Sequence, residues 1–348
     1  MDKLCSQLYA LGCEFLAFSA FQKNNYVREE MLLEAIEERE TTSRDAVRLY
    51  QRMQTQLNDR QDSPDNILRA LRLRWRHAEI ATRGRETRQL WQENFHELHE
   101  LLDEYYQLQK LKLLSATANI KAIFNQEHER DPGIAFLEAM QGTDVDAELP
   151  PLARAYYLTI QMMQAEDGEK WFQELLPLLG EMATRFDPSE ASELYGYALN
   201  FCIRNSNKGR QEYLRHASSL YIQLLDNKLI LQNGELSPQQ FKNIVVLHCQ
   251  VERLDWVRTF IDEYASCLPK DSRKGDLLYN EAILSYYHGA YAPAIEQFKH
   301  VIAELTDDIF YGIDARVYLW KSYFEHYDDL TMEEVDDMTK LYDSFRVF

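Results

Sequence analysis

Four short motifs mark the starts of helices and strongly constrain the fold class. "SPDN" at 63–66, "DPSE" at 187–190 and "SPQQ" at 237–240 each place Ser or Asp directly before a proline. The side-chain oxygen of the first residue accepts an otherwise unbonded backbone N–H, and proline suits the first helical position because no N–H is needed there. "TMEE" at 331–334 has the spacing of a capping box. These motifs predict helices that begin at four defined points.

Between these points the apolar residues recur with the period of a helix, and no stretch sustains the alternation of a strand. Leu68, Leu71, Trp75 and Ala78 form one such stripe, which predicts that Trp75 belongs to the core. Gly and Pro number only 12 and 9 in 348 residues, whereas an all-β chain of this length needs more turn residues. We therefore expect an all-α protein built of consecutive antiparallel helical hairpins.

Two segments of the C-terminal half have a similar layout. "KNIVVLHCQVERLDWVRTFI" from residue 242 and "YNEAILSYYHGAYAPAIEQF" from residue 279 each contain an apolar helix, a short turn and a second apolar helix. Leu254 of the first corresponds to Tyr291 of the second, 37 residues later. A period in this range is typical of stacked helical hairpins, because one hairpin cannot bury its apolar face alone.

The segment 280–298 resembles a tetratricopeptide repeat (TPR). Ala282 and Ala294 stand at small-residue positions of that family, "GAY" resembles its Gly-x-Tyr turn, and Phe298 stands at its aromatic position. Glu281 and Ser285 depart from the family's preference for Leu and Tyr. The chain is also similar to bacterial proteins of divergent TPR-like build. The resemblance implies an α-α solenoid, in which hairpins stack into a right-handed superhelix.

The resemblance covers about residues 239–324, and the chain before residue 131 is less regular. We expect an irregular helical region at 1–130 and TPR-like repeats at 131–348, continuous as one solenoid.

In TPR proteins the first helix of each pair lines a concave groove. By position, this resemblance implies a partner-binding groove formed by Lys242, Asn243, Val246, Gln250, Tyr279, Asn280, Ile283, Tyr286, Tyr287 and Lys321. Packing between repeats is the competing interpretation of the same residues. The function implied is a non-enzymatic scaffold that binds a protein or peptide. The alternative is a helical sensor or regulator that binds a small ligand between hairpins.

The charge of the chain narrows the range of partners. With 38 basic and 57 acidic residues the formal net charge is −19. Nucleic acid and anionic membrane surfaces repel such a chain, so we expect neither as a partner. The apolar ending "LYDSFRVF" predicts one of three outcomes: packing on the last hairpin, a homodimer through the C-terminal end, or a longer chain.

Other features indicate a cytoplasmic protein without a cofactor. The five cysteines include no C-x-x-C pair, which is typical of reduced and mostly buried thiols. Glu14 interrupts the first apolar stretch, so we expect no export signal. The sequence contains no run of 18 apolar residues, so we expect no membrane span. No nucleotide-binding or nucleophile motif occurs, and we expect no enzymatic activity.

Two segments have both a chemical and a structural interpretation. Glu93 and His96 form a Glu-x-x-His pair, as in di-iron bundles, but the second pair that such a site requires is missing. We interpret them as a solvated helix face, and expect no bound metal. The segment 68–88 contains seven arginines, which either form an anion-binding patch or are paired with acids of the chain. Glu79 is placed to pair with Arg76 and Arg83.

Overall fold

A computed structural model describes residues 2–39, 44–58, 62–83, 87–124, 133–141, 149–182, 184–304 and 309–345. Within these ranges every regular element is a helix, and only two isolated β-bridges form. The prediction of an all-α protein is therefore confirmed. The chain divides into two compact units, Met1–Glu190 and Ala191–Phe348. The boundary predicted at residue 130 was placed where the TPR-like repeats were expected to begin, and it stays a prediction.

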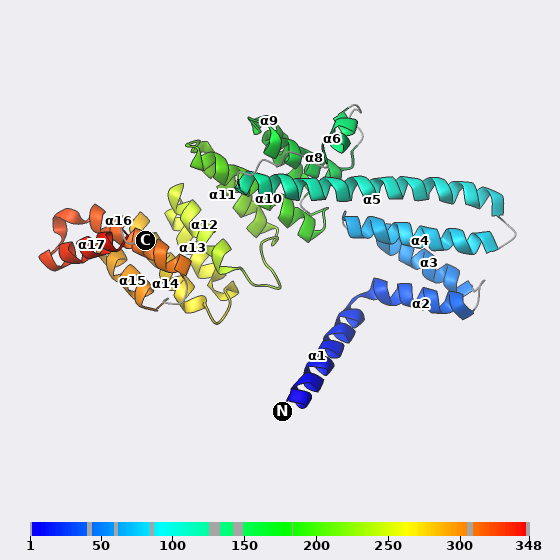
Figure 1. Cartoon of the computed structure of the whole chain (residues 1–348), viewed down its shortest axis with the longest axis horizontal. Helices are drawn as coiled ribbons and strands as arrows, with labels where there is room; N and C mark the ends of the chain where they lie inside the picture. Colours follow the sequence, from blue (N-terminus) through cyan, green and yellow to red (C-terminus); the bar gives the residue numbers. More distant parts are fainter. Residues whose placement is uncertain are drawn as a thin grey trace. The chain divides into compact units, whose positions relative to one another are not determined.

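Unit 1 is built from eight described helices that precede residue 183 (Figure 1). They are α1 (Asp2–Lys23), α2 (Asn25–Arg39), α3 (Arg44–Asn58), α4 (Pro64–Arg83), α5 (Thr87–Phe124), α6 (Ile134–Gln141), α8 (Pro151–Gln164) and α9 (Glu169–Met182).

Neighbours in sequence pack against each other in unit 1, and the long helix α5 contacts both α4 and α8. An apolar cluster with Tyr26, Leu33, Tyr50, Met53 and Leu73 joins α2, α3 and α4. Asp62 and Phe186 form an isolated parallel bridge, which ties the start of α4 to the turn after α9. These contacts fix the face of α2, α4 and α5 that is described below.

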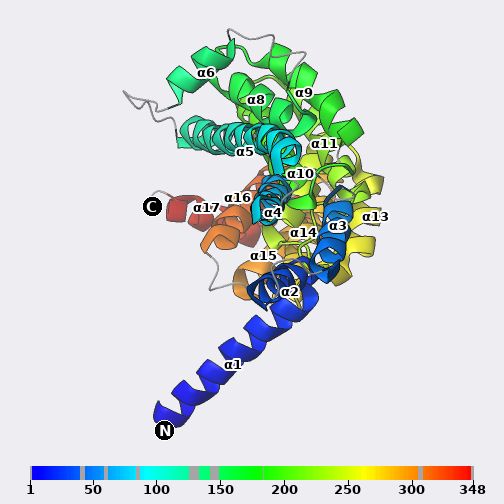
Figure 2. The ribbon, with the colours of Figure 1, turned by 90° about the vertical axis from the view of Figure 1, so that its right-hand side faces the viewer.

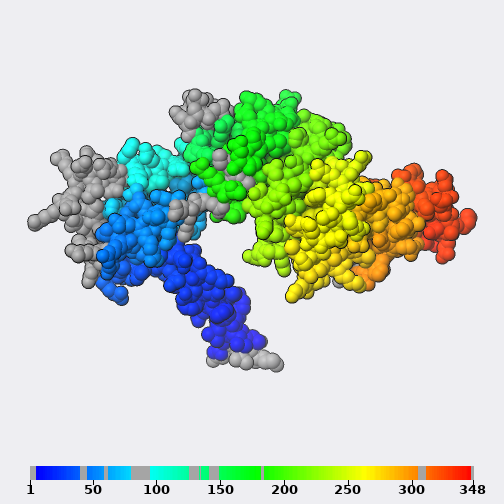
Figure 3. Space-filling view, turned by 180° about the vertical axis from the view of Figure 1, so that it is seen from behind, coloured from blue at the N-terminus to red at the C-terminus, as the bar shows by residue number. Residues whose placement is uncertain are grey.

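Helix α1 differs from the other helices in how little of it is covered. It extends away from α2 in two views (Figures 2 and 3). Six of its large apolar side chains are more than half exposed; they are Leu8, Tyr9, Leu11, Phe15, Leu16 and Phe18.

The remaining helices run from residue 188 to residue 345. They are α10 (Pro188–Asn207), α11 (Glu212–Asp226), α12 (Pro238–Gln250), α13 (Leu254–Tyr264), α14 (Arg273–Tyr287), α15 (Tyr291–Glu304), α16 (Ile309–Glu325) and α17 (Met332–Phe345), with 3₁₀ turns at Ala265–Cys267 and Tyr327–Asp329. Apart from the first residues of α10, they belong to unit 2.

Unit 2 packs as a chain of neighbouring helices, in which α14 contacts α12, α13, α15 and α16. Phe298 of α15 and Tyr311 of α16 lie edge to face with Tyr279 of α14, with ring centroids 6.3 and 4.8 Å away. At the end of the unit, the Tyr342 ring of α17 lies 6.2 Å from the Trp320 ring of α16. Tyr342 of the apolar ending therefore contacts the preceding helix, while its side chain stays 52% exposed.

All four predicted helix starts are confirmed by their caps. The Oγ atoms of Ser63 and Ser237 each accept the backbone N–H three residues on, at 3.2 Å. The Asp187 carboxylate accepts the backbone N–H of Ser189 at 3.0 Å. The Thr331 N–H donates to Glu334 at 2.8 Å, and the Glu334 N–H donates to the Thr331 hydroxyl at 3.3 Å. Local hydrogen bonding thus decides where these helices begin.

Over the described residues, no helix combines the length and apolarity that crossing a lipid bilayer requires.

Candidate functional site

Half of the predicted groove residues line a single hollow in unit 2. The hollow has a volume of about 780 Å³ and is formed by α10, α11, α12 and the end of α14. The predicted residues at its wall are Lys242, Asn243, Val246, Gln250 and Tyr287. The other lining residues are Ile203, Ser206, Asn207, Gln211, Leu214, Tyr221 and Leu247. The wall therefore combines aliphatic side chains with amides and two tyrosines.

The Lys242 ammonium is already paired with other side chains of unit 2. It forms an ion pair with the Asp314 carboxylate of α16. It also lies above the rings of Tyr279 and Tyr311, 5.4 and 5.3 Å from their centroids. A lysine held by a carboxylate and two aromatic faces is a poor receptor for a terminal carboxylate. The hollow is therefore close to neutral at this wall, where hydrogen-bonding side chains lie beside aliphatic ones.

Amide side chains give the hollow both donors and acceptors. The Asn243 carbonyl oxygen accepts a hydrogen bond from the Gln239 amide at 2.9 Å, and the Asn243 side chain lies near the Tyr221 hydroxyl. Burial raises the pKa of Tyr221 to about 12, so this hydroxyl stays protonated at neutral pH. Gln250 is exposed at the rim. Such groups suit the N–H and C=O groups of a peptide backbone.

The tyrosine pair of α14 is shared between packing and the hollow. The Tyr286 and Tyr287 rings lie 5.3 and 6.3 Å from the ring of Tyr318 in α16. The Tyr287 and Tyr318 hydroxyl oxygens are 3.4 Å apart. Only Tyr287 also lines the hollow. Part of each ring therefore packs between α14 and α16.

The remaining predicted groove residues lie elsewhere. Tyr279, Asn280 and Ile283 have no exposed surface, which corrects the expectation that they face a groove. The physical reason is that α14 is enclosed by α12, α13, α15 and α16, so its inward positions form the core. Asn280 uses its amide to bond the Asp276 carbonyl at 2.7 Å. Lys321 is exposed on α16, with its ammonium 4.9 Å from the Tyr318 ring centroid.

Nothing in the sequence indicated that residues of α10 and α11 line the hollow. Tyr221, for example, follows the apolar period of its helix like any core residue. Only the packing of α11 beside α12 brings it to the wall.

The Glu-x-x-His segment lies on α5. His96 Nε2 is 3.3 Å from a Glu100 carboxylate oxygen one turn away, and both side chains are exposed. The side chain of Glu93 lies outside the described part of the chain. Among the residues that are described, no group of three or more His, Cys, Asp or Glu is placed to hold a metal ion.

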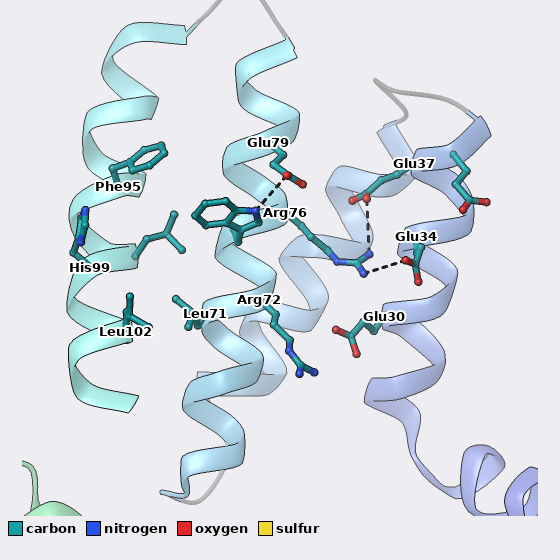
Figure 4. Close-up of a pocket in the computed structure, with 13 residues that line it drawn as sticks. Glu30, Glu34, Glu37, Leu71, Arg72, Arg76, Glu79, Phe95, His99 and Leu102 are labelled. Carbon is teal, nitrogen blue, oxygen red and sulfur yellow. Dashed lines mark hydrogen bonds and ion pairs between the residues drawn. The ribbon is translucent and has the colours of Figure 1, made fainter. Parts of the chain in front are cut away.

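The arginine segment is internally paired as far as it is described, except at Arg72. Arg69 pairs with Asp65 at 3.3 Å and Arg74 with Glu97 at 2.6 Å. Arg76 pairs with Glu34 and Glu37 of α2 rather than with Glu79 (Figure 4). The side chains of Arg83, Arg85 and Arg88 lie outside the described residues.

The expectation that Trp75 is a core residue is wrong. Trp75 is 52% exposed, and its indole N–H donates to the Glu79 carboxylate at 3.2 Å. The apolar stripe placed it correctly on one face of α4, but within the described part of the chain the ring meets Phe95 of α5 only edge to face and about half of its surface stays accessible.

No protein-family model matches this chain, and comparisons with curated proteins and with solved structures find no match either.

Proposed function

We propose that this protein is a non-enzymatic scaffold whose TPR-like hairpins form a solenoid and bind a protein or peptide segment in the hollow of unit 2. The observation that carries the proposal is the convergence of five predicted groove residues on that hollow. They come from α12 and α14, the helices that the family resemblance assigns to a groove.

The chemistry of the wall supports a peptide rather than a charged ligand. Asn207, Gln211 and Gln250 are exposed amides that can donate to and accept from a peptide backbone. Val246 and Tyr287 offer apolar contact, and tyrosine contributes large contact area at low entropic cost. Because Lys242 is engaged by Asp314, recognition does not depend on a free carboxylate in the ligand.

All five cysteines are free thiols. Free thiols support a reducing compartment, and we propose that the scaffold works in the cytoplasm.

Peptide selection tests the proposal directly. Random peptides are selected against the full chain, and their affinities are measured for wild type, for Val246→Glu and for Ile313→Glu. Ile313 is a matched control, because it is an exposed aliphatic residue of the same unit that does not line the hollow. We expect Val246→Glu to weaken binding about tenfold or more, and the control about twofold or less. A folded Val246→Glu protein that binds the selected peptides as tightly as wild type would refute the scaffold at this hollow.

A small-ligand sensor remains the second candidate, because about 780 Å³ is within the size range of small-molecule sites. Native mass spectrometry of the purified chain separates the two functions. A stoichiometric small molecule that is lost from Val246→Glu and retained by Ile313→Glu would favour the sensor over the scaffold.

A further inference from the structure

A second and larger hollow lies in unit 1, on the face where α2, α4 and α5 come together (Figure 4). Its volume is about 1050 Å³, and every residue that lines it belongs to unit 1. It shares no residue with the hollow of unit 2. An inference about it therefore goes beyond the proposed function and stands or fails separately.

One wall of this hollow is apolar and comes from α4 and α5. Its members are Leu71, Trp75, Phe95, Leu98 and Leu102. Leu102 is 49% exposed, and about half of the Trp75 surface is accessible as well. The Trp75 indole is held by its bond to Glu79 and by an edge-to-face contact with Phe95, with centroids 6.5 Å apart. A large aromatic that is accessible and fixed in position is typical of a binding anchor.

The opposite wall is acidic and comes from α2. It carries Glu30, Glu34, Glu37 and Glu38 on successive turns of one face. Arg76 reaches Glu34 and Glu37 at 3.5 and 3.8 Å, whereas Glu30 and Glu38 form no ion pair with any described residue. Its five glutamates and two arginines give the lining a formal net charge of −3.

We propose that this face binds a cationic amphipathic α-helix of a partner protein. The apolar side of that helix would lie against Trp75 and Leu102, and its Lys or Arg residues would face Glu30 and Glu38. Anchors at i, i+3 or i+4, and i+7 are the usual way in which a helix occupies an apolar groove. An α-helix about 10 Å across fills roughly 120 Å³ per residue, so the hollow matches roughly nine residues, or two and a half turns.

Charge complementarity selects this occupant over the others that the fold offers. The exposed helix α1 of a second copy is apolar, but its two acidic and two basic residues leave it without net charge. An anionic peptide or nucleic acid would meet a wall of the same sign. A basic helix removes like-charge repulsion within α2 and covers the apolar wall at the same time.

The probe is a fluorescent synthetic peptide of about four turns, with a Leu and Phe stripe flanked by lysines. Binding to the full chain is followed by fluorescence polarisation at about 0.15 M ionic strength, and peptide helicity by circular dichroism. Two control peptides accompany it. One keeps the Leu and Phe stripe but has glutamates in place of the lysines. The other has the same composition as the probe in a scrambled order, so that no stripe remains.

Paired variants locate the binding on the protein. Leu102→Glu disrupts the apolar wall, and Leu113→Glu is its control, because Leu113 is a 62% exposed leucine of the same helix outside the hollow. Glu30→Lys with Glu38→Lys reverses the acidic wall. Its control is Glu138→Lys with Glu166→Lys, which changes the net charge equally at exposed sites of the same unit. Thermal unfolding establishes that each variant is folded.

We expect saturable binding of the striped cationic peptide with a gain of helix. Both hollow variants should weaken it about tenfold or more, and both controls about twofold or less. Equal losses in the hollow and control variants would overturn the inference, because binding would then follow the net charge of −19 alone. Binding of the scrambled or glutamate peptide as tightly as the striped cationic one would also overturn it. So would an absence of saturable binding, or a bound peptide that is not helical.

Discussion

Tyr156 donates its hydroxyl hydrogen bond to the carboxylate of Glu190 at 2.5 Å, across 34 residues of sequence. The second oxygen of the same carboxylate accepts from the Lys112 ammonium at 2.7 Å. Glu190 is 5% exposed, so α5, α8 and the first turn of α10 meet at one buried negative charge. A carboxylate at this depth is stable only because both of its oxygens are bonded.

We expect Glu190→Ala to lower the free energy of unfolding by about 3 kcal/mol, since it leaves a half-buried ammonium and a buried hydroxyl without their shared acceptor. Glu190→Gln should cost less, about 1–2 kcal/mol, because the amide oxygen still accepts one bond. Urea unfolding at neutral pH measures both values. Glu166→Ala, at an exposed turn of the same unit, serves as the control with a change below about 0.5 kcal/mol. A Glu190→Ala protein as stable as this control would show that the contact is dispensable.

Stability should fall in mildly acidic solution because of His248. Burial lowers the pKa of His248 to about 4, from an ordinary value of 6.5. Its ring stacks on Trp256 with centroids 4.0 Å apart, and its Nδ1 lies 2.8 Å from the Ile244 carbonyl oxygen. Below pH 6.5 the unfolded chain binds a proton that the folded chain does not bind until about pH 4. The free energy of unfolding is therefore not reduced by His248 above about pH 6.5, and it decreases as the pH falls from 6.5 toward 4.

Urea unfolding at about pH 7.5 and pH 5 measures the effect, which should be roughly 2 kcal/mol for this residue. The variant His248→Phe keeps an aromatic ring beside Trp256 but cannot titrate. We expect its stability to change less between the two pH values than that of wild type, by the same roughly 2 kcal/mol. Equal pH dependence in the two proteins would contradict the burial of a neutral histidine.

The cap at Ser237 provides a test of local structure. Its Oγ accepts the Gln240 N–H at the start of α12, the helix that carries Lys242 and Val246. We expect Ser237→Ala to lower the free energy of unfolding by about 1 kcal/mol, because that N–H loses its acceptor. Ser237→Asp should retain most of the stability, since the carboxylate can accept the same bond and suits a helix N-terminus. Thermal unfolding compares the three proteins, and an Ala variant as stable as the Asp variant would contradict the cap.

The five thiols should react in distinct phases. Cys5 and Cys13 are exposed, Cys267 is partly covered, and Cys202 and Cys249 are buried. Burial raises the pKa of Cys249 to about 12, so only about one molecule in ten thousand carries the reactive thiolate near pH 8. With a thiol-specific chromogenic reagent we expect two fast equivalents, a slower third, and two that appear only on unfolding. Loss of the fast phase in the double variant Cys5→Ser, Cys13→Ser would establish its origin, whereas fast labelling of Cys249 would contradict the packing of α12.

The sequence analysis predicted mostly buried thiols. This prediction is correct for Cys202 and Cys249 and wrong for Cys5 and Cys13.

The groove prediction depended on a rule of position, and packing changed its outcome. A helical period tells which residues share a face, but it does not tell how many neighbours cover the helix. For α12 that rule led to Lys242, Asn243, Val246 and Gln250, which do line a hollow. For α14 the neighbouring helices enclose most of the helix, and of the pair at its end only Tyr287 reaches the same hollow.

The sequence by itself determined the helical class and the starts of four helices. Both depend on interactions within a few residues, such as the Thr331–Glu334 capping box, so no distant contact is needed to specify them. Tertiary structure alone decided what the side chains face. In the "DPSE" motif Glu190 is the acid that ends the first helical turn, yet its carboxylate accepts hydrogen bonds from Lys112 and Tyr156 of two other helices. Trp75 follows the core period and stays half exposed, because burial depends on whether another helix arrives to cover that face.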